Sequence, residues 1–519
     1  CASLTLVAGC GPIPLIALGA AAGAGAFSGG GGGHGNPGGN VGGTLPPPPP
    51  PPPVPAPPPP PPPPPMPGGP PGPPLFPTFA WASQSEALPA GGGFQNDAYA
   101  VAAFPDGSSV ATGYFESQAV FGSTTLTSAG AQDILLARYD PRGNVVWAKR
   151  AGGSANDAGG GVAVVGATIV VGGDFQGSAT FGPGEPGQAV IASVGIQDLF
   201  VAQYGGDGTF QSIKQVGGSD AVLGAASVAP CGSNGSTLVA GFVYRQASTP
   251  GTVTFGSGEP NQTTLVAPVV LHGGGFLARY NSDLTLAWAK EPTATDSFDV
   301  SRMGAFTDGS SVVAGTFSGT ATFGAGEAHQ TVLTSTVGTT FFLARFAPDG
   351  TLVWAKQANG EAFGRSVAAL PDGTTVVGGD FRTTTVFGPG EPHETSLVPS
   401  SDDMFVARFD VDGALLWAQD PGAGEIEGAA ALADGTTLLC GEMATEALWL
   451  GRVSPGGALV SSTAIQATSL DHPFARALAT VPDGTAILVG QFGAATLTFP
   501  GSGMLSRVGG GDIFIGRFQ

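Results

Sequence analysis

The feature that most constrains this chain is an internal repeat of about 65 residues, which starts near residue 79. One unit begins at Arg365 and reads "RSVAALPDGTTVVGGDFRTTTVFGPGEPHETSLVPSSDDMFVARFDVDGALLWAQ". Its β-rich runs are bounded by Pro-Asp-Gly and Asp-Gly turns, which are typical of hairpins. The pattern predicts four main strands, "VAAL", "TTVVGGDF", "MFVARF" and "ALLWAQ". It also predicts an extra hairpin, "TTTVFGPGEPHETSLV", between the second and third strands.

The third-strand phrase counts the units, because an Arg recurs at its centre and Gln203 replaces it in the second unit. The series predicts seven units, with a longer third and a shorter sixth, as expected for an extended and a missing extra hairpin. We expect the Arg to form an ion pair or bind a carbonyl between units rather than to clamp a substrate. The recurring residues are Arg138, Arg279, Arg345, Arg408, Arg452 and Arg517.

The ends of the repeat region predict a closed ring. The seventh unit stops at "GDIFIGRFQ" without a fourth strand, whereas the region opens with "FPTFAWASQ", whose "FAWA" matches the "LVWAK" strand. The first strand would then complete the last sheet and remove exposed edges. Ser212 takes the place of the fourth-strand Trp in the second unit. We expect the aromatic series to belong to the core rather than to a ligand site: Trp81, Trp147, Trp288, Trp354 and Trp417.

Two groups of phrases resemble the bacterial seven-bladed β-propeller repeat family, abbreviated SBBP. One comprises "DPRGNVVWAK", "APDGTLVWAK" and "DVDGALLWAQ", and the other "GGDFQGSATFG" and "AGTFSGTATFG". The resemblance covers nearly all of residues 79–519 and is weakest in the third and sixth units. It implies an all-β, seven-bladed propeller located outside the cytoplasm. It implies no enzyme activity and transfers no catalytic residue to this chain.

The first residues resemble the end of a bacterial lipoprotein signal peptide. In "SLTLVAGCG", small residues precede Cys10, as in a lipobox, so we expect residues 1–10 to be a signal-peptide remnant with Cys10 lipidated. Lipidation of Cys1, or no lipid at all, stays open. The apolar segment that follows Cys10 is shorter than a membrane-spanning helix requires. Any membrane attachment would therefore depend on the lipid.

Residues 11–78 are predicted to be a disordered stalk. A Gly-rich run from Gly29 to Gly43 is typical of flexible coil, and a Pro-rich run from Pro46 to Pro74 favours polyproline II. An inert linker, or a ligand for Pro-binding modules, is the alternative. The β-propeller domain would then occupy residues 79–519. The expected location is the bacterial cell envelope, either as an outer-membrane lipoprotein or outside the cell.

Charge and cysteine content narrow the partners. The formal net charge of −20 argues against nucleic acid and favours cationic partners or solubility. Cys231 and Cys440 are expected to be small apolar residues of the core rather than a disulfide framework. We expect a monomer, with no nucleic-acid partner.

The extra hairpins carry the one repeated polar feature. In "FGPGEP", "FGSGEP" and "FGAGEA" a Glu occupies equivalent places on neighbouring units, so these carboxylates could attract a cation or a basic partner at one rim. The alternative is a solvated Glu in a tight turn. His329 and His393 follow two of these residues, but they make a weak case for a metal. The candidate rim contacts are Glu185, Glu259, Glu327 and Glu391.

No catalytic, cofactor or metal motif is evident, since the chain has no P-loop, HExxH or nucleophile elbow. The sequence therefore favours a non-enzymatic binding or scaffold module for a protein or glycan partner, with no cofactor. The alternative is a secreted propeller enzyme that acts on polysaccharide, or holds a quinone, in its central channel. Two suitably placed carboxylates among 38 acidic residues would suffice for glycoside hydrolysis. The lining of the channel should distinguish these hypotheses.

Overall fold

The computed structural model separates Leu75–Gln519 from the preceding residues as one compact part. The predicted signal remnant, Cys1, Cys10 and all but the last two residues of the predicted stalk lie outside the described residues. The structure describes residues 77–88, 95–246, 248–269, 273–467, 473–493 and 496–519.

Every regular element in these described stretches is a β-strand and none is a helix, which confirms the all-β prediction. The strands pair antiparallel in sets that match the sequence repeats, and in all sets but the sixth the extra hairpin follows the second strand. Each set is given from its inner to its outer strand. The first unit has β3 (Asn96–Ala103), β4 (Ser109–Phe121), β5 (Thr124–Tyr139) and β6 (Val145–Gly153), the second has β7 (Asp157–Val165), β8 (Thr168–Phe175), β11 (Asp198–Gly205) and β12 (Phe210–Val216), and the third has β13 (Ala221–Cys231), β14 (Ser236–Arg245), β17 (Gly275–Tyr280) and β18 (Leu286–Lys290).

The fourth unit has β20 (Phe298–Ala305), β21 (Ser311–Phe323), β22 (Thr331–Phe346) and β23 (Leu352–Gln357), and the fifth has β24 (Ala362–Ala369), β25 (Thr375–Phe381), β28 (Asp403–Phe409) and β29 (Leu415–Ala431). The sixth has the second half of β29, β30 (Thr437–Met443), β31 (Leu448–Val453) and β32 (Leu459–Ile465), and the seventh has β33 (Pro473–Thr480), β34 (Ala486–Phe492), β37 (Asp512–Phe518) and β1 (Phe79–Gln84).

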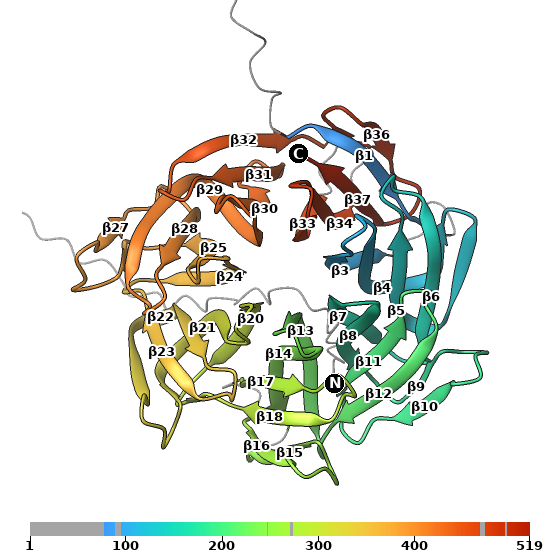
Figure 1. Ribbon diagram of the computed structural model, residues 1–519, viewed down its shortest axis with the longest axis horizontal. Helices are drawn as coiled ribbons and strands as arrows, with labels where there is room; N and C mark the ends of the chain where they lie inside the picture. Colours follow the sequence, from blue (N-terminus) through green and yellow to red (C-terminus); the bar gives the residue numbers. More distant parts are fainter. Residues whose placement is uncertain (1–76, 89–94, 247, 270–272, 468–472, 494–495) are drawn as a thin grey trace, which may run out of the picture. The chain divides into compact units, whose positions relative to one another are not determined.

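The extra hairpins lie at the circumference (Figure 1). In the first and fourth units they continue the long strands β4–β5 and β21–β22, and the sixth unit has no strand between β30 and β31, as its length predicted. Short strands β2 (Glu86–Leu88) and β19 (Thr293–Ala294) pair with β4 and β21. The separate hairpin strands are β9 (Ser178–Phe181) and β10 (Ala189–Ala192), β15 (Gly251–Phe255) and β16 (Thr263–Ala267), β26 (Thr385–Phe387) and β27 (Thr395–Leu397), and β35 (Thr496–Phe499) and β36 (Gly503–Ser506).

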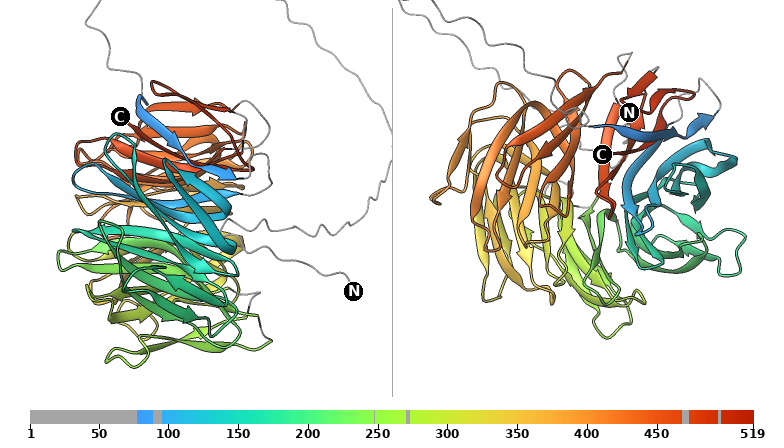
Figure 2. Two further views of the ribbon diagram at one scale, coloured as in Figure 1. Left: turned by 90° about the vertical axis from the view of Figure 1, so that its right-hand side faces the viewer. Right: turned by 45° about the horizontal axis from the view of Figure 1, so that its top comes forward.

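Figure 1 shows the sheets arranged radially around a common centre, with the first strand of each unit innermost. The views of Figure 2 show neighbouring sheets stacked face to face. This arrangement of four-stranded antiparallel sheets is that of a β-propeller. The outer strand of the last sheet comes from the other end of the described chain: β1 pairs antiparallel with β37, and Trp81 lies opposite Arg517.

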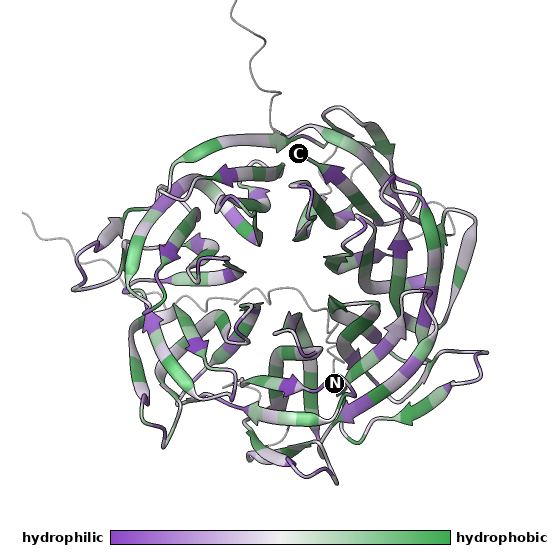
Figure 3. Ribbon diagram, viewed as in Figure 1, coloured by the Kyte–Doolittle hydropathy of each residue, from purple (hydrophilic) through white to green (hydrophobic). Residues whose placement is uncertain are grey.

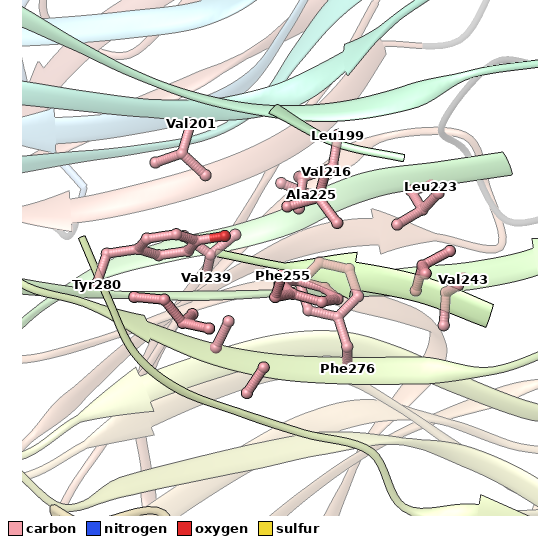
Figure 4. Packing of buried hydrophobic residues seen from close by; sticks show 14 of the residues in the cluster. Leu199, Val201, Val216, Leu223, Ala225, Val239, Val243, Phe255, Phe276 and Tyr280 are labelled. Carbon is pink, nitrogen blue, oxygen red and sulfur yellow. The ribbon is translucent and has the colours of Figure 1, made fainter. Parts of the chain in front are cut away.

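The core lies between neighbouring sheets rather than at one centre. In the cluster drawn in Figure 4, Val201 of β11 belongs with Val239 of β14 and Phe276 of β17, so one apolar layer joins the second and third units. The rings of Phe255 and Phe276 lie 5.0 Å apart between centroids. Because both faces of each sheet are covered, the strands are continuous apolar runs. Cys231 and Cys440 are buried and free, as the sequence predicted.

A recurring polar contact joins successive units. In each case an Arg from the third strand and the Trp opposite it in the fourth strand donate to one carbonyl oxygen in the next unit's turn between its third and fourth strands. We call this pair of donors on one carbonyl the latch. It confirms the carbonyl-binding role predicted for the Arg and the structural role predicted for the Trp. Figure 3 shows hydrophilic positions within these otherwise apolar third strands. The latches are Arg138 and Trp147 on Gly206, Arg279 and Trp288 on Pro348, Arg345 and Trp354 on Val411, Arg408 and Trp417 on Pro455, and Arg517 and Trp81 on Pro141.

The Trp ring also covers a Gly of the same turn. Gly143 lies in the left-handed region, at φ +85, and a Cβ there would lie 2.5 Å from the Trp81 ring. The second unit lacks both latch residues, and its partner turn differs accordingly. Gln203 donates to Ser282 O at 2.8 Å and accepts from Ser212, while buried Leu284 adopts φ +61 in place of the Gly. Contact between these units is thus retained with smaller donors.

The sixth unit has no corresponding latch among the described residues. Ser461 replaces the Trp opposite Arg452, and that Arg pairs with Asp434 of its own unit at 3.2 Å. The turn that would supply the next carbonyl is absent, because β37 and β1 come from opposite parts of the chain and no turn joins them. The contact between the sixth and seventh units therefore depends mainly on apolar packing.

We expect Arg517→Ala to lower the free energy of unfolding by about 3 kcal/mol, since the mutation removes several hydrogen bonds of a mostly buried cation. Arg452→Ala changes the same repeat position where the side chain is one-third exposed and unlatched, so it should cost under about 1 kcal/mol. Urea unfolding of both variants provides the measurement. If both variants lost the same free energy of unfolding, the hydrogen bonds to the latch carbonyl would contribute nothing to stability.

Candidate functional site

The innermost strands each contain a β-bulge at the same repeat position. In β3, for example, the register shifts between Ala98 and Ala100, so Tyr99 is left unpaired. A bulge locally twists a strand and redirects a side chain. The residues skipped by these shifts are Tyr99, Gly160, Ala226, Ser301, Arg365, Glu427 and Arg476.

A cavity of about 140 Å³ lies at the centre and is lined by residues of all the innermost strands. One side of it has small residues, including Gly161 and Ala226. The other side carries Arg302, Glu427 and Arg476. The lining therefore combines small residues with charged ones, and by itself it does not decide between a binding module and an enzyme. We call Arg302, Arg365, Glu427 and Arg476, on β20, β24, β29 and β33, the charged arc.

Arg365 is the centre of an ion-pair network between the fifth and sixth units. Its Nε donates to Asp380 Oδ1 at 2.5 Å, its Nη2 lies 3.2 Å from Glu425 Oε2, and its Nη1 lies 3.4 Å from Glu427 Oε1. Asp380 is fully buried, and burial raises its pKa although Arg365 opposes this effect. One guanidinium therefore serves three carboxyl groups.

Arg476 joins the seventh unit to the first. Its Nη2 donates to Asp97 Oδ2 at 2.9 Å, and its guanidinium lies 4.8 Å from the centroid of the Phe474 ring. Burial raises the pKa of Asp97, and the attraction of Arg476 counteracts part of that rise. The guanidinium is held on one side by charge and on the other by an aromatic face.

Three carboxyl groups of the sixth unit, Glu425, Glu427 and Glu442, form what we call the acid triplet. Glu425 on β29 and Glu442 on β30 are direct cross-strand partners, an arrangement that destabilises like charges. Burial, together with the neighbouring carboxylates, raises the pKa of Glu425 to about 7 and of Glu442 to about 8. Arg365 forms ion pairs with the first two groups, whereas the Glu442 carboxyl group has no ion pair or hydrogen bond among the described residues, and Arg476 and Arg365 lower its pKa only from a distance.

The predicted rim carboxylates do not converge on one place. Each of these carboxylates is mostly buried. It accepts one hydrogen bond from a Lys ammonium on the outer strand of the preceding unit and one from a backbone N–H on the outer strand of its own unit. We call this arrangement the staple. In Glu391, Oε1 accepts from Lys356 at 2.7 Å and Oε2 from Leu415 N at 2.6 Å. The other staples pair Glu185 with Lys149, Glu259 with Lys214, and Glu327 with Lys290.

The remaining polar features of the sequence are local. In most Asp-Gly turns the Asp accepts a hydrogen bond from the backbone N–H two residues later, as Asp106 does from Ser108 N at 2.8 Å. His329 and His393 are exposed on separate hairpins. In the part of the chain that the structure describes, no group of three or more His, Cys, Asp or Glu side chains is placed to hold a metal. Nor does a helix there have the length and hydropathy needed to cross a membrane.

No protein-family model and no curated protein matches the chain. Several solved structures are similar at low level. Sqt1 from Chaetomium thermophilum has 9% identity over 82% of this chain and 89% of that chain, with a TM-score of 0.38. The Dos1 propeller has 9% identity over 85% and 95%, with a TM-score of 0.39. These similarities are too low to indicate a function.

Sequence reasoning did not find the charged arc or the acid triplet. The bulge position has a different residue in almost every unit, so it leaves no repeated signal. The only sequence signal for these charged residues was that they differ from the residues at the same repeat positions of other units. Glu425 and Glu427 flank one Ile in "GEIEG", where the fifth unit has "FGRS".

We expect the staple to contribute about 1 kcal/mol, as for a partly buried ion pair. Glu391→Gln retains an acceptor for Leu415 N, and Lys356→Met removes the ammonium. Thermal unfolding of both single variants and the double variant measures the coupling directly. Additive losses would mean that the two side chains do not stabilise the fold through each other.

Glu442→Gln should stabilise the protein more at pH 8.5 than at pH 5. A folded-state pKa near 8, above the unfolded value near 4.5, means that the folded protein holds a proton that the unfolded chain has released between these pH values. Stability from this group is therefore present at low pH and is lost as pH rises through 8. Melting curves from pH 5 to pH 8.5 should diverge for wild type and variant, whereas parallel curves would contradict the burial argument.

Proposed function

We propose that residues 79–519 form a seven-bladed β-propeller closed by β1, and that it acts as a non-enzymatic binding or scaffold module for a protein or glycan partner. The observation that supports this proposal best is the channel, where Arg302, Glu427 and Arg476 of the charged arc line a cavity that every innermost strand borders. Arg476 and Glu427 are already held in ion pairs, with Asp97 and Arg365 respectively, so they form a preorganised polar surface. The staples occupy the rim carboxylates, and recognition is therefore assigned to the channel.

We further propose that the module is displayed at the bacterial cell envelope as a monomer. The support comes from the sequence alone: the lipobox-like residues before Cys10, the Gly-rich and Pro-rich segment up to residue 78, and the resemblance to the SBBP family. The spacer would hold the propeller away from the membrane. The net charge of −20 disfavours nucleic acid as the partner.

A polysaccharide-cleaving propeller is the second candidate, and the acid triplet favours it. Glu425 and Glu442 lie directly opposite each other, and their raised pKa values would keep one carboxyl group protonated near neutral pH. A glycosidase needs such a proton donor beside a carboxylate. Arg365 pairs with Glu425 and Glu427, and this pairing argues for a structural role of the triplet instead.

To test the binding function, p-azidophenylalanine replaces Tyr99, a near-isosteric change in the cavity wall, in the full chain expressed in its own cells. Illumination should give a discrete adduct that is absent when the same group replaces Val353, which is 38% exposed on the outer strand β23. Adducts from both positions or from neither would contradict recognition at the channel. Polysaccharide cleavage by the wild type that Glu442→Gln abolishes would establish the enzyme instead.

A further inference from the structure

A cavity of about 350 Å³ lies at the circumference, where the seventh unit meets the first (Figure 1). Strands β1 and β2 supply one wall. The start of β6 and the end of the hairpin between β4 and β5 supply the other. We call this space the seam cavity, and its lining includes Ser83, Glu86, Gly122 and Val145.

The seam cavity lies where other units carry a longer hairpin loop. In the third unit this loop comprises seven residues, 256–262, and contains the staple residue Glu259. In the first unit the corresponding loop comprises only Gly122 and Ser123. The loop that would hold a staple Glu against the outer strand is therefore five residues shorter at this one junction.

The walls of the seam cavity match those that hold a staple. In the third unit a Cβ on Gly256 would lie 2.8 Å from Leu286 Cβ, and Leu286 N donates to Glu259 Oε2 at 2.6 Å. A Cβ on Gly122 would likewise lie 3.4 Å from Val145 Cβ. Since β5 and β6 pair with the same register shift as β17 and β18, the N–H of Val145 is directed as that of Leu286 is. No described side chain accepts a hydrogen bond from it.

The seventh unit shows that this N–H does not require a carboxylate. Its hairpin has no Glu, and Phe79 N donates to the backbone oxygen of Pro500 at 2.8 Å instead. A loop that presents a backbone carbonyl therefore satisfies the same donor.

The seam cavity also exchanges the charges of a staple. Ser83 stands where the staple Lys stands in the preceding strands, so the cation is missing. Glu86 follows three residues later, so the wall itself supplies a carboxylate. This carboxylate forms no ion pair or hydrogen bond with any described residue, including the exposed Arg142 of the adjoining turn. The residues three positions after the four staple Lys are all uncharged, namely Gly152, Gly217, Thr293 and Asn359.

We propose that the seam cavity binds an exposed loop of a partner protein that carries a Lys or Arg. A backbone carbonyl of this loop accepts from Val145 N, and its cationic side chain pairs with Glu86. None of the residues outside the described ranges is a Lys or an Arg, so those segments do not supply the cation. The net charge of −20 attracts a basic partner. This surface is separate from the channel and goes beyond the function proposed above.

The probes are three peptides built on the loop 256–262, acetyl-Gly-Ser-Gly-X-Pro-Asn-Gln-amide, in which X takes the place of Glu259 and is Lys, Gln or Glu. Each peptide is titrated into the isotope-labelled full chain, and the backbone amide resonance of Val145 is followed by NMR. We expect the Lys peptide to bind roughly fivefold more tightly than the Gln peptide, as for a partly exposed ion pair, and the Glu peptide to bind most weakly. A Glu peptide that binds as tightly as the Lys peptide, or a Val145 resonance that none of the peptides shifts, would overturn the inference.

Charge reversal provides the second measurement. Glu86→Gln should remove the advantage of the Lys peptide, and Glu86→Lys should reverse the order, so that the Glu peptide binds roughly fivefold more tightly than the Lys peptide. Asp412→Asn is the matched control, because it removes one negative charge from an exposed turn of the fifth unit, and it should leave the order unchanged. An order that Glu86→Lys does not alter would contradict the pairing with Glu86.

A restored staple tests the location. In this variant Ser-Gly-Glu-Pro-Asn-Gln replaces Ser123, which reproduces the loop of the third unit, and Ser83→Lys supplies the cation. The chain's own loop should then fill the seam cavity, so none of the three peptides should bind. Lys-peptide binding that persists in this variant with wild-type affinity would place the peptide elsewhere and overturn the inference.

Discussion

At the latched contacts, one carbonyl oxygen shared by an Arg and a Trp of the preceding unit orients neighbouring sheets. Apolar packing between sheets is strong but non-directional, so by itself it would allow one sheet to slide on the next. The latch supplies the direction, because the acceptor belongs to a tight turn and both donors come from paired strands. At Pro141 the two donors, Trp81 and Arg517, come from opposite ends of the described chain. The same contact that orients neighbours along the chain therefore also orients the first and last units.

Most of the scaffold could be predicted from the sequence because the latch donors are side chains with a repeat period. The strands of the unit that begins at Arg365 lie where the turns placed them, and the substitutions at Gln203 and Ser212 were visible. The acceptors were not, since a backbone carbonyl has no sequence signature. Leu284 shows the limit: where the Trp across the contact is missing, a buried Leu side chain occupies the turn position that elsewhere is Gly, a relation that only the structure reveals.

The staples could have been predicted, but the comparison needed pairs of consecutive units. A Lys stands two residues after the fourth-strand Trp, or after Ser212 in the second unit, wherever the next unit carries the hairpin Glu. Gln419 replaces it before the sixth unit and Ser83 before the first, and neither of those units has the Glu. Considering each Glu within its own hairpin suggested a free rim carboxylate. Considering it with the preceding strand would have indicated an ion pair.

The residues that line the channel could not be predicted, because the residue at the bulge position is not repeated from unit to unit. The bulge position holds Tyr, Gly, Ala, Ser, Arg or Glu in different units with the same register shift, so the backbone there does not depend on one side chain. Charge can then gather on one side of the channel, at the cost of desolvating Glu425 and Glu442. The latches and inter-sheet cores supply the stability that tolerates this cost. Specificity in such a fold therefore resides where its units differ most, at the centre they all share.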